Sequence, residues 1–172
     1  MNRIAVLLTI LACLFVASCG NAGNTADANA NAANADNAGS RPHDSIEEFS
    51  MLANFPFALE EVLWENRPMA KPGSERVPTQ NERKIVAVIR FSEEDTPKFI
   101  AEIEKSGPGK PVEISSEEWF PPELRAQSDV TGSDTLSGTA FSAQPFMLPP
   151  FTEGRLIKVD GNDSFVLEMF SK

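Results

Sequence analysis

Residues Lys84–Phe91 read KIVAVIRF, and this segment constrains the fold more than any other part of the chain. Apolar side chains occupy both alternating sets of positions, so a strand here presents apolar residues on both of its faces. Such a strand is typical of the interior of a sheet. We therefore expect a sheet with residues 84–91 near its centre.

The C-terminal segment RLIKVDGNDSFVLEMF predicts a β-hairpin. Two apolar runs, Leu156–Val159 and Phe165–Phe170, flank a turn at Asp160–Asp163 that is built from small polar residues. The segment KPVEIS (110–115) predicts a further short strand. The segment LEEVLWENR (59–67) alternates in a way that fits a strand, but a short helix also fits it.

Helical signals flank the predicted central strand. Ser45 and Glu48 have the spacing of a capping box, and the apolar residues that follow predict a helix over 46–54. A second helix is expected from Ser92, with acidic residues in its first turn and Lys105 near its end, just before Gly107.

A third helical signal lies between the segments KPVEIS and RLIKVD. Ser115 and Glu118 repeat the capping-box spacing, and Pro121 and Pro122 stand where a short helix can begin. Residues 41–172 are therefore expected to form a single α+β domain. Its sheet should be mainly antiparallel, with the helices on one face and a β-hairpin at the C-terminus.

The chain is acidic, with 25 Asp and Glu against 15 Lys and Arg and a formal net charge of −10. Nucleic acids and anionic lipid surfaces attract basic patches, so this balance argues against nucleic acid as a partner. Residues 41–172 contain no cysteine, so packing rather than disulfides should stabilise this part of the chain.

An apolar run, Ile4–Ala17, follows a single basic residue near the N-terminus. Its 14 residues would span about 21 Å as a helix, which is less than the roughly 30 Å hydrocarbon core of a bilayer. A short apolar segment with a basic start and small residues at its end predicts a secretory signal peptide over residues 1–18.

The end of this segment, Val16, Ala17, Ser18 and Cys19, resembles the lipobox of bacterial lipoprotein precursors. The resemblance implies cleavage between Ser18 and Cys19, a diacylglyceryl group on the Cys19 sulfur and a further acyl chain on the new amino terminus. It also implies an envelope location, with the membrane as partner through the lipid. Because Gly20 rather than Asp follows the cysteine, the same resemblance favours the outer membrane over the outer face of the inner membrane. An ordinary secretory signal with a chance cysteine is the alternative.

Residues 19–40 join this cysteine to the predicted domain. From Gly20 to Ser40 the chain has 8 Ala and 6 Asn and no aromatic residue. Such a segment has too little apolar surface to offset the entropy lost on ordering it, so we expect a disordered linker. An Ala-rich helix is disfavoured by the frequent Asn and Gly.

Few residues suggest catalytic or metal chemistry. The single histidine, His43, stands beside Pro42 at the linker boundary and is expected to be exposed. DGNDS (160–164) begins like a calcium loop but lacks the later glycine and glutamate of that motif, so a hairpin turn explains it. We predict no cofactor, no metal site and no catalytic residue. The acidic groups Glu93, Glu94 and Asp95, and Glu117, Glu118 and Glu123, are expected to serve helix starts.

The segment EEWFPPEL carries the one candidate for ligand binding. Trp119 and Phe120 stand beside two prolines and could form an exposed aromatic shelf for a peptide or glycan. Burial of both rings under the following helix is the preferred alternative. FMLPPF (146–151) raises the same question, and burial is preferred there too.

The leading functional hypothesis is a lipid-anchored envelope protein that acts as a non-enzymatic binding or interaction module, with an envelope protein or a glycan as partner. A hydrolase of envelope glycans that uses only carboxylates is one alternative, since paired acidic side chains suffice for that chemistry. A structural subunit of an envelope complex is the other.

Overall fold

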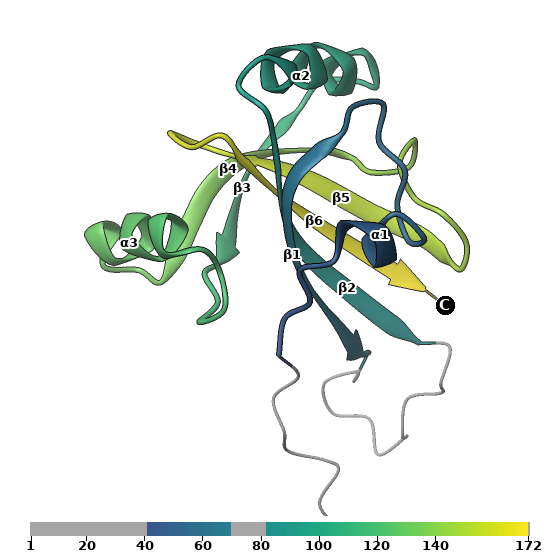
Figure 1. The fold of residues 1–172 in the computed structure, drawn as a ribbon. Coiled ribbons are helices and arrows are strands. Elements are labelled where there is room, and N and C mark those ends of the chain that lie inside the picture. Colours follow the sequence, from purple (N-terminus) through teal and green to yellow (C-terminus); the bar gives the residue numbers. More distant parts are fainter. Residues whose placement is uncertain (1–40, 70–81, 172) are drawn as a thin grey trace, which may run out of the picture. The chain divides into compact units, whose positions relative to one another are not determined.

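The computed structural model describes residues 41–69 and 82–171, and within these ranges the chain forms one six-stranded antiparallel sheet with three short helices (Figure 1). The strands are β1 (Leu59–Pro68), β2 (Arg83–Phe91), β3 (Lys110–Ser115), β4 (Thr135–Ser142), β5 (Phe151–Val159) and β6 (Ser164–Ser171). The helices are α1 (Ile46–Phe49), α2 (Asp95–Lys105) and α3 (Pro122–Thr131). The predicted signal peptide, the Ser18–Cys19 cleavage site and the linker lie outside the described residues.

The strand order across the sheet is β1-β2-β6-β5-β4-β3, and each neighbouring pair is antiparallel. β2 lies inside the sheet between β1 and β6, which confirms the interior position predicted from its sequence. β5 and β6 form the predicted C-terminal hairpin, and the ambiguous segment 59–67 is a strand. In the hairpin turn the Asn162 Oδ1 accepts a hydrogen bond from the Ser164 amide at 2.9 Å.

Two separate cores cover the two faces of the sheet. One core contains Phe49 of α1, Phe99 and Ile103 of α2, and the β2 residues Ile85, Ala87, Ile89 and Phe91. The other contains Leu124 of α3 and the intervening β2 residues Val86 and Val88. We call these sides the α1/α2 face and the α3 face.

The prediction that the helices lie on one face is therefore wrong. β2 and β6 are apolar on both faces, and each face needs its own cover to keep those side chains from water. Figure 1 shows α3 beside β3 and β4, well apart from α1 and α2. Helices α1 and α2 pack on one face of the sheet, and α3 packs on the other.

Helix α1 is much shorter than the predicted helix over 46–54. Its N-cap is as expected, because the Ser45 Oγ accepts a hydrogen bond from the Glu48 amide at 3.2 Å. Beyond Leu52 the backbone instead pairs with residues 146–148: the Asn54 amide donates to the Phe146 carbonyl at 2.8 Å. Tertiary hydrogen bonds thus take the place of further helical turns.

The predicted capping box at Ser115 and Glu118 is also wrong. Ser115 is the last residue of β3, and α3 begins only at Pro122, with Pro121 in the N-cap position. Proline disfavours helical backbone in the residue before it, so two successive prolines delay the helix to the second of them. This delay leaves residues 116–121 as a connection outside helix and strand, with a turn in which the Phe120 amide donates to the Glu117 carbonyl at 3.0 Å, and it forms part of the candidate site. We call it the crossing segment.

Candidate functional site

The crossing segment contacts the opposite edge of the sheet through Glu117. β1 and β3 are the two edge strands, yet Glu117, two residues after β3, binds Arg67 near the end of β1. The Arg67 Nη2 donates to the Glu117 Oε2 at 2.5 Å and the Nη1 donates to Oε1 at 3.1 Å. We call this two-bond ion pair the clasp.

Two neighbouring side chains, Glu65 and Trp119, form hydrogen bonds with the residues of the clasp. The Arg67 Nε donates to the Glu65 Oε2 at 2.6 Å, and the Trp119 Nε1 donates to the Glu117 Oε2 at 3.2 Å. The hydrogen bonds that Arg67 donates to Glu117 raise the pKa of Arg67 and outweigh the opposing effect of its partial burial, and the bond to Glu65 raises it further. The guanidinium therefore holds two carboxylates, Glu65 on β1 and Glu117 on the crossing segment.

A second ionic group lies on the same face, on β2, β6 and β5. Glu168 is paired directly across from Arg155 on β5, and Lys84 lies on β2 two residues from Val86, which is the β2 residue paired with Glu168. The Lys84 Nζ donates to the Glu168 Oε1 at 2.7 Å, and the Arg155 Nε donates to Oε2. We call these three residues the charged triad.

The carboxylate of the charged triad is the buried member. The side chain of Glu168 is 11 % exposed, whereas those of Lys84 and Arg155 are 31 % and 44 % exposed. Burial by itself raises the pKa of the Glu168 carboxyl, but the hydrogen bonds and charges of the two cations outweigh this effect and lower it. Glu168 is therefore a carboxylate at neutral pH.

A cavity of about 330 Å³ lies between the charged triad and the crossing segment. Its polar lining comes from the charged triad and from Glu113, Ser115 and Glu117. Its apolar lining comes from Val86, Ile114, Phe120 and Val166. We call it the triad cavity. A concave, partly apolar space with a few fixed charges has the general character of a small-molecule site.

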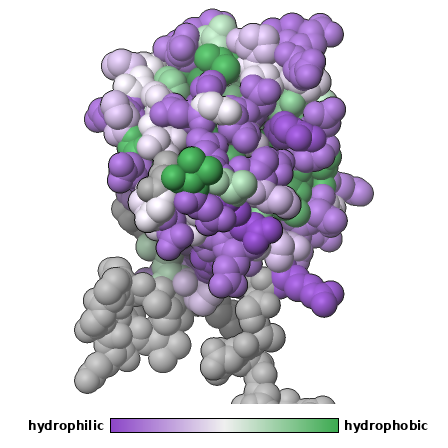
Figure 2. All heavy atoms as spheres, turned by 90° about the vertical axis from the view of Figure 1, so that its left-hand side faces the viewer, coloured by the Kyte–Doolittle hydropathy of each residue, from purple (hydrophilic) through white to green (hydrophobic). Residues whose placement is uncertain are grey.

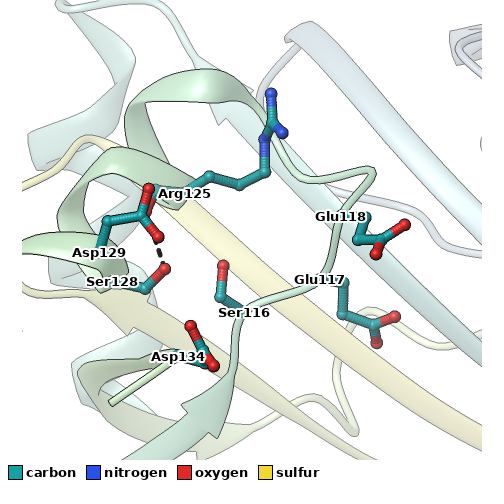
Figure 3. A pocket seen from close by; sticks show the side chains of 7 residues that line it. All are labelled: Ser116, Glu117, Glu118, Arg125, Ser128, Asp129 and Asp134. Carbon is teal, nitrogen blue, oxygen red and sulfur yellow. Dashed lines mark hydrogen bonds between the residues drawn. The ribbon is translucent and has the colours of Figure 1, made fainter. Parts of the chain in front are cut away.

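A neighbouring hollow of about 370 Å³ lies between the crossing segment and α3 (Figure 3). Four acidic residues and Arg125 are among the residues that line it. Figure 3 shows the carboxylates of Glu117 and Glu118 pointing away from Ser116 and Asp134 rather than toward them. Among the described residues no group of acidic, histidine or cysteine side chains is arranged to hold a metal ion.

A third hollow, of about 310 Å³, lies near the start of α2 and the turn between β5 and β6. Arg90 lines it and is already paired, through its Nη2, with Glu61 at 2.6 Å. Its other charged lining residues, Glu60, Glu93 and Asp163, are all acidic. The triad cavity has two cations in its lining, Lys84 and Arg155, whereas each of the other two hollows has one.

Trp119 and Phe120 do not form an exposed aromatic shelf, the possibility that the sequence left open. Phe120 is 3 % exposed and belongs to the core of the α3 face, as the preferred alternative of burial predicted. Trp119 packs against it edge to face, with ring centroids 4.8 Å apart, and is partly exposed. Phe146 and Phe151, in the FMLPPF segment, are buried as well. Trp119 therefore contributes through its hydrogen bond to Glu117 rather than as part of a flat aromatic surface.

The other candidates from the sequence lie apart from the triad cavity. Glu94 and Asp95 both bind Lys98 at 2.8 Å, which is the structural use expected of them. His43 has a 48 % exposed side chain, as predicted, but its ring stacks on Trp64 at 4.4 Å. Of the acidic groups considered, Glu117 alone lines the triad cavity.

Sequence reasoning missed Arg67 and the charged triad. One signal was present: Lys84 and Glu168 are charged residues within strands that are mainly apolar, and charged groups in such places are usually paired. The identity of the partners was not readable, because β2, β5 and β6 meet through long-range pairing.

The face that is turned to the viewer in Figure 2, the side on which α3 lies in Figure 1, is mainly hydrophilic. Hydrophobic side chains gather there only in small, separate groups. No helix among the described residues is both long and apolar enough to cross a membrane. We found no protein-family model, no curated protein and no solved structure that matches the chain.

Proposed function

We propose that this chain is a lipid-anchored envelope protein that binds a small ligand in the triad cavity and does not transform it. The observation that carries the proposal is that the two partly buried carboxylates of the cavity, Glu168 and Glu117, are each held by cations. Groups fixed in this way provide a preorganised polar wall, which favours binding of a complementary ligand.

The same pairing argues against the carboxylate-dependent hydrolase. That chemistry requires one acidic side chain that stays protonated until it donates its proton to the leaving group, and so requires a raised pKa. The pKa of Glu168 is lowered by Lys84 and Arg155, and both oxygens of Glu117 accept hydrogen bonds from Arg67. Neither side chain is suited to the role of general acid.

The location rests on the lipobox resemblance at Ser18 and Cys19. We expect Cys19→Ala to abolish incorporation of a fatty-acid analogue, because the acceptor sulfur is lost while the apolar segment is kept. The measurement is labelling in cells followed by fractionation of the outer and inner membranes. Labelling of the variant, or no labelling of either protein, would contradict lipidation.

The binding proposal is tested with the full lipoprotein in detergent. The protein is mixed with a low-molecular-weight extract of the cell envelope and examined by native mass spectrometry. Wild type should retain a small molecule, Arg155→Gln should lose it, and Arg125→Gln, on exposed α3 outside the cavity, should retain it. Melting temperatures establish that both variants are folded.

Two outcomes would overturn the proposal. Release of the molecule in a chemically altered form would move the hydrolase to first place. Absence of any ligand that depends on Arg155 would favour a structural subunit of an envelope complex.

A further inference from the structure

Building on the proposed binding function, we infer that the triad cavity binds a small zwitterion, a free amino acid or short peptide, with its carboxylate at the charged triad and its ammonium group at Glu117. The inference comes from the distribution of charge between the two walls of the cavity and from the size of the space between them.

The wall formed by the sheet has an excess of positive charge. Lys84 and Arg155 supply two cations, and Glu168 supplies one carboxylate, which leaves one net positive charge. The carboxylate is the buried member and the two cations are the more exposed members, so the cations are the more accessible to a ligand. A guanidinium and an ammonium group side by side form a suitable site for a ligand carboxylate.

The opposing wall has an excess of negative charge. Glu117 lines the cavity from the crossing segment, whereas its partner Arg67 and the neighbouring Glu65 are β1 residues on the sheet side, where their two charges cancel. Glu113 also lines the cavity, and among the described residues none forms an ion pair with it. A cationic group of the ligand would be attracted to this side of the cavity.

The volume of the triad cavity and the residues that line it narrow the class of ligand further. A cavity of about 330 Å³ is at the small end of ligand sites, so it suits a molecule of few atoms. Val86, Val166 and Phe120 also line the cavity, but each is at most 3 % exposed, so the contacts of the ligand are mainly polar and its apolar part is small. The chain's net charge of −10 repels a simple anion at long range, whereas a zwitterion has no net charge to repel.

The test is isothermal titration calorimetry on the full lipoprotein in detergent with four probes. L-alanine and L-alanyl-L-alanine carry both charges, N-acetyl-L-alanine carries only the negative charge, and L-alaninamide carries only the positive charge. We expect at least one of the two zwitterions to bind about tenfold or more tightly than either blocked compound, since each blocked compound loses one charge-assisted contact.

Single substitutions test whether the ligand carboxylate binds at the charged triad and the ammonium group binds at Glu117. Arg155→Gln should weaken zwitterion binding about tenfold or more and leave binding of L-alaninamide unchanged. Glu117→Gln should weaken the zwitterion by a larger factor than N-acetyl-L-alanine, because only the zwitterion loses a charge-assisted contact while both lose the clasp. Arg125→Gln should match wild type with every probe.

Equal affinity for the zwitterions and a blocked compound would overturn the inference, and so would the absence of binding by both zwitterions. If a different molecule is nevertheless retained from the envelope extract in an Arg155-dependent way, the binding function stands and only this ligand class fails. If no such molecule is retained, the proposed function fails as well.

Discussion

The residue that contributes most to the character of the cavity is Glu168. It is largely buried, and its charge is compatible with that burial because Lys84 and Arg155 both donate to it. Its folded-state pKa lies below the ordinary value of 4.5. The stability that it contributes is therefore fully present above about pH 4.5 and is lost as the pH falls through the lower, folded-state pKa.

We expect Glu168→Gln to lower the free energy of unfolding at pH 7 by about 1–3 kcal/mol, because it leaves two cations side by side without a carboxylate. Glu113→Gln, an exposed change at the same cavity, should stay within about 0.5 kcal/mol of wild type. Urea denaturation at pH 7 and at pH 3.5 measures both variants. The deficit of Glu168→Gln should shrink at the lower pH, and a deficit that stays constant or grows would contradict the role assigned to Glu168.

At the scale of the element, β4 decides how closely the outer strands pack. Its sequence TLSGTAFS has small residues at its centre, which gives it little apolar alternation, and it was not predicted as a strand. Gly138 pairs with Val112 on β3 and with Val159 on β5. A Cβ on Gly138 would lie 2.5 Å from the Lys158 carbonyl oxygen and 2.8 Å from the Ile157 Cγ2, so the close approach of β4 to β5 requires glycine here.

We expect Gly138→Ala to destabilise the protein by about 1–3 kcal/mol, because the backbone oxygen in its way cannot move without disturbing the β4–β5 ladder. Hydrogen exchange should increase along β3 and β4. The matched variant is Gly132→Ala after α3, where φ is +66° and the space is open, so the cost of about 1 kcal/mol is purely conformational. Equal exchange profiles for the two variants would show that the close approach at Gly138 is not limiting.

At the scale of the whole molecule, the clasp links the two edge strands of an open sheet. Arg67 on β1 and Glu117 beyond β3 are 50 positions apart in sequence and belong to opposite edges, and their ion pair holds the crossing segment over the α3 face. The triad cavity is therefore bounded on one side by a contact that the backbone ladder does not enforce.

A double-mutant cycle with Arg67→Gln and Glu117→Gln should give a coupling energy of about 1 kcal/mol, because the ion pair is bidentate and partly buried from solvent. The exposed pair Glu102 and Lys105 on α2 serves as the reference, with a coupling below about 0.5 kcal/mol. Each clasp variant should also speed amide exchange in residues 116–121 without affecting the β5–β6 hairpin. A coupling no larger than that of the α2 pair would argue against the clasp as a boundary of the cavity.

Much of the local structure was predictable from the sequence, because it follows from periodicity and turn chemistry within a few residues. The strands at 84–91 and 110–115, the C-terminal hairpin and the helix ending at Lys105 all appear where their patterns indicate. The sequence-based predictions were wrong where the hydrophobic pattern was weak or where the backbone pairs with a segment distant in sequence. β4 lacks apolar alternation, and α1 ends early because residues 52–54 pair with residues 146–148.

The sequence by itself determined that β2 is an interior strand, because a segment that is apolar at successive positions is stable only with neighbours and cover on both sides. The tertiary structure alone decided that Lys84, Arg155 and Glu168 meet on one face and that Glu117 reaches Arg67. Those contacts depend on the register between strands far apart in the chain and on the path of the crossing segment over the sheet. The strand register and the path of the crossing segment are both selected by the free energy of packing the two cores as a whole. No local pattern along the chain therefore encodes these contacts.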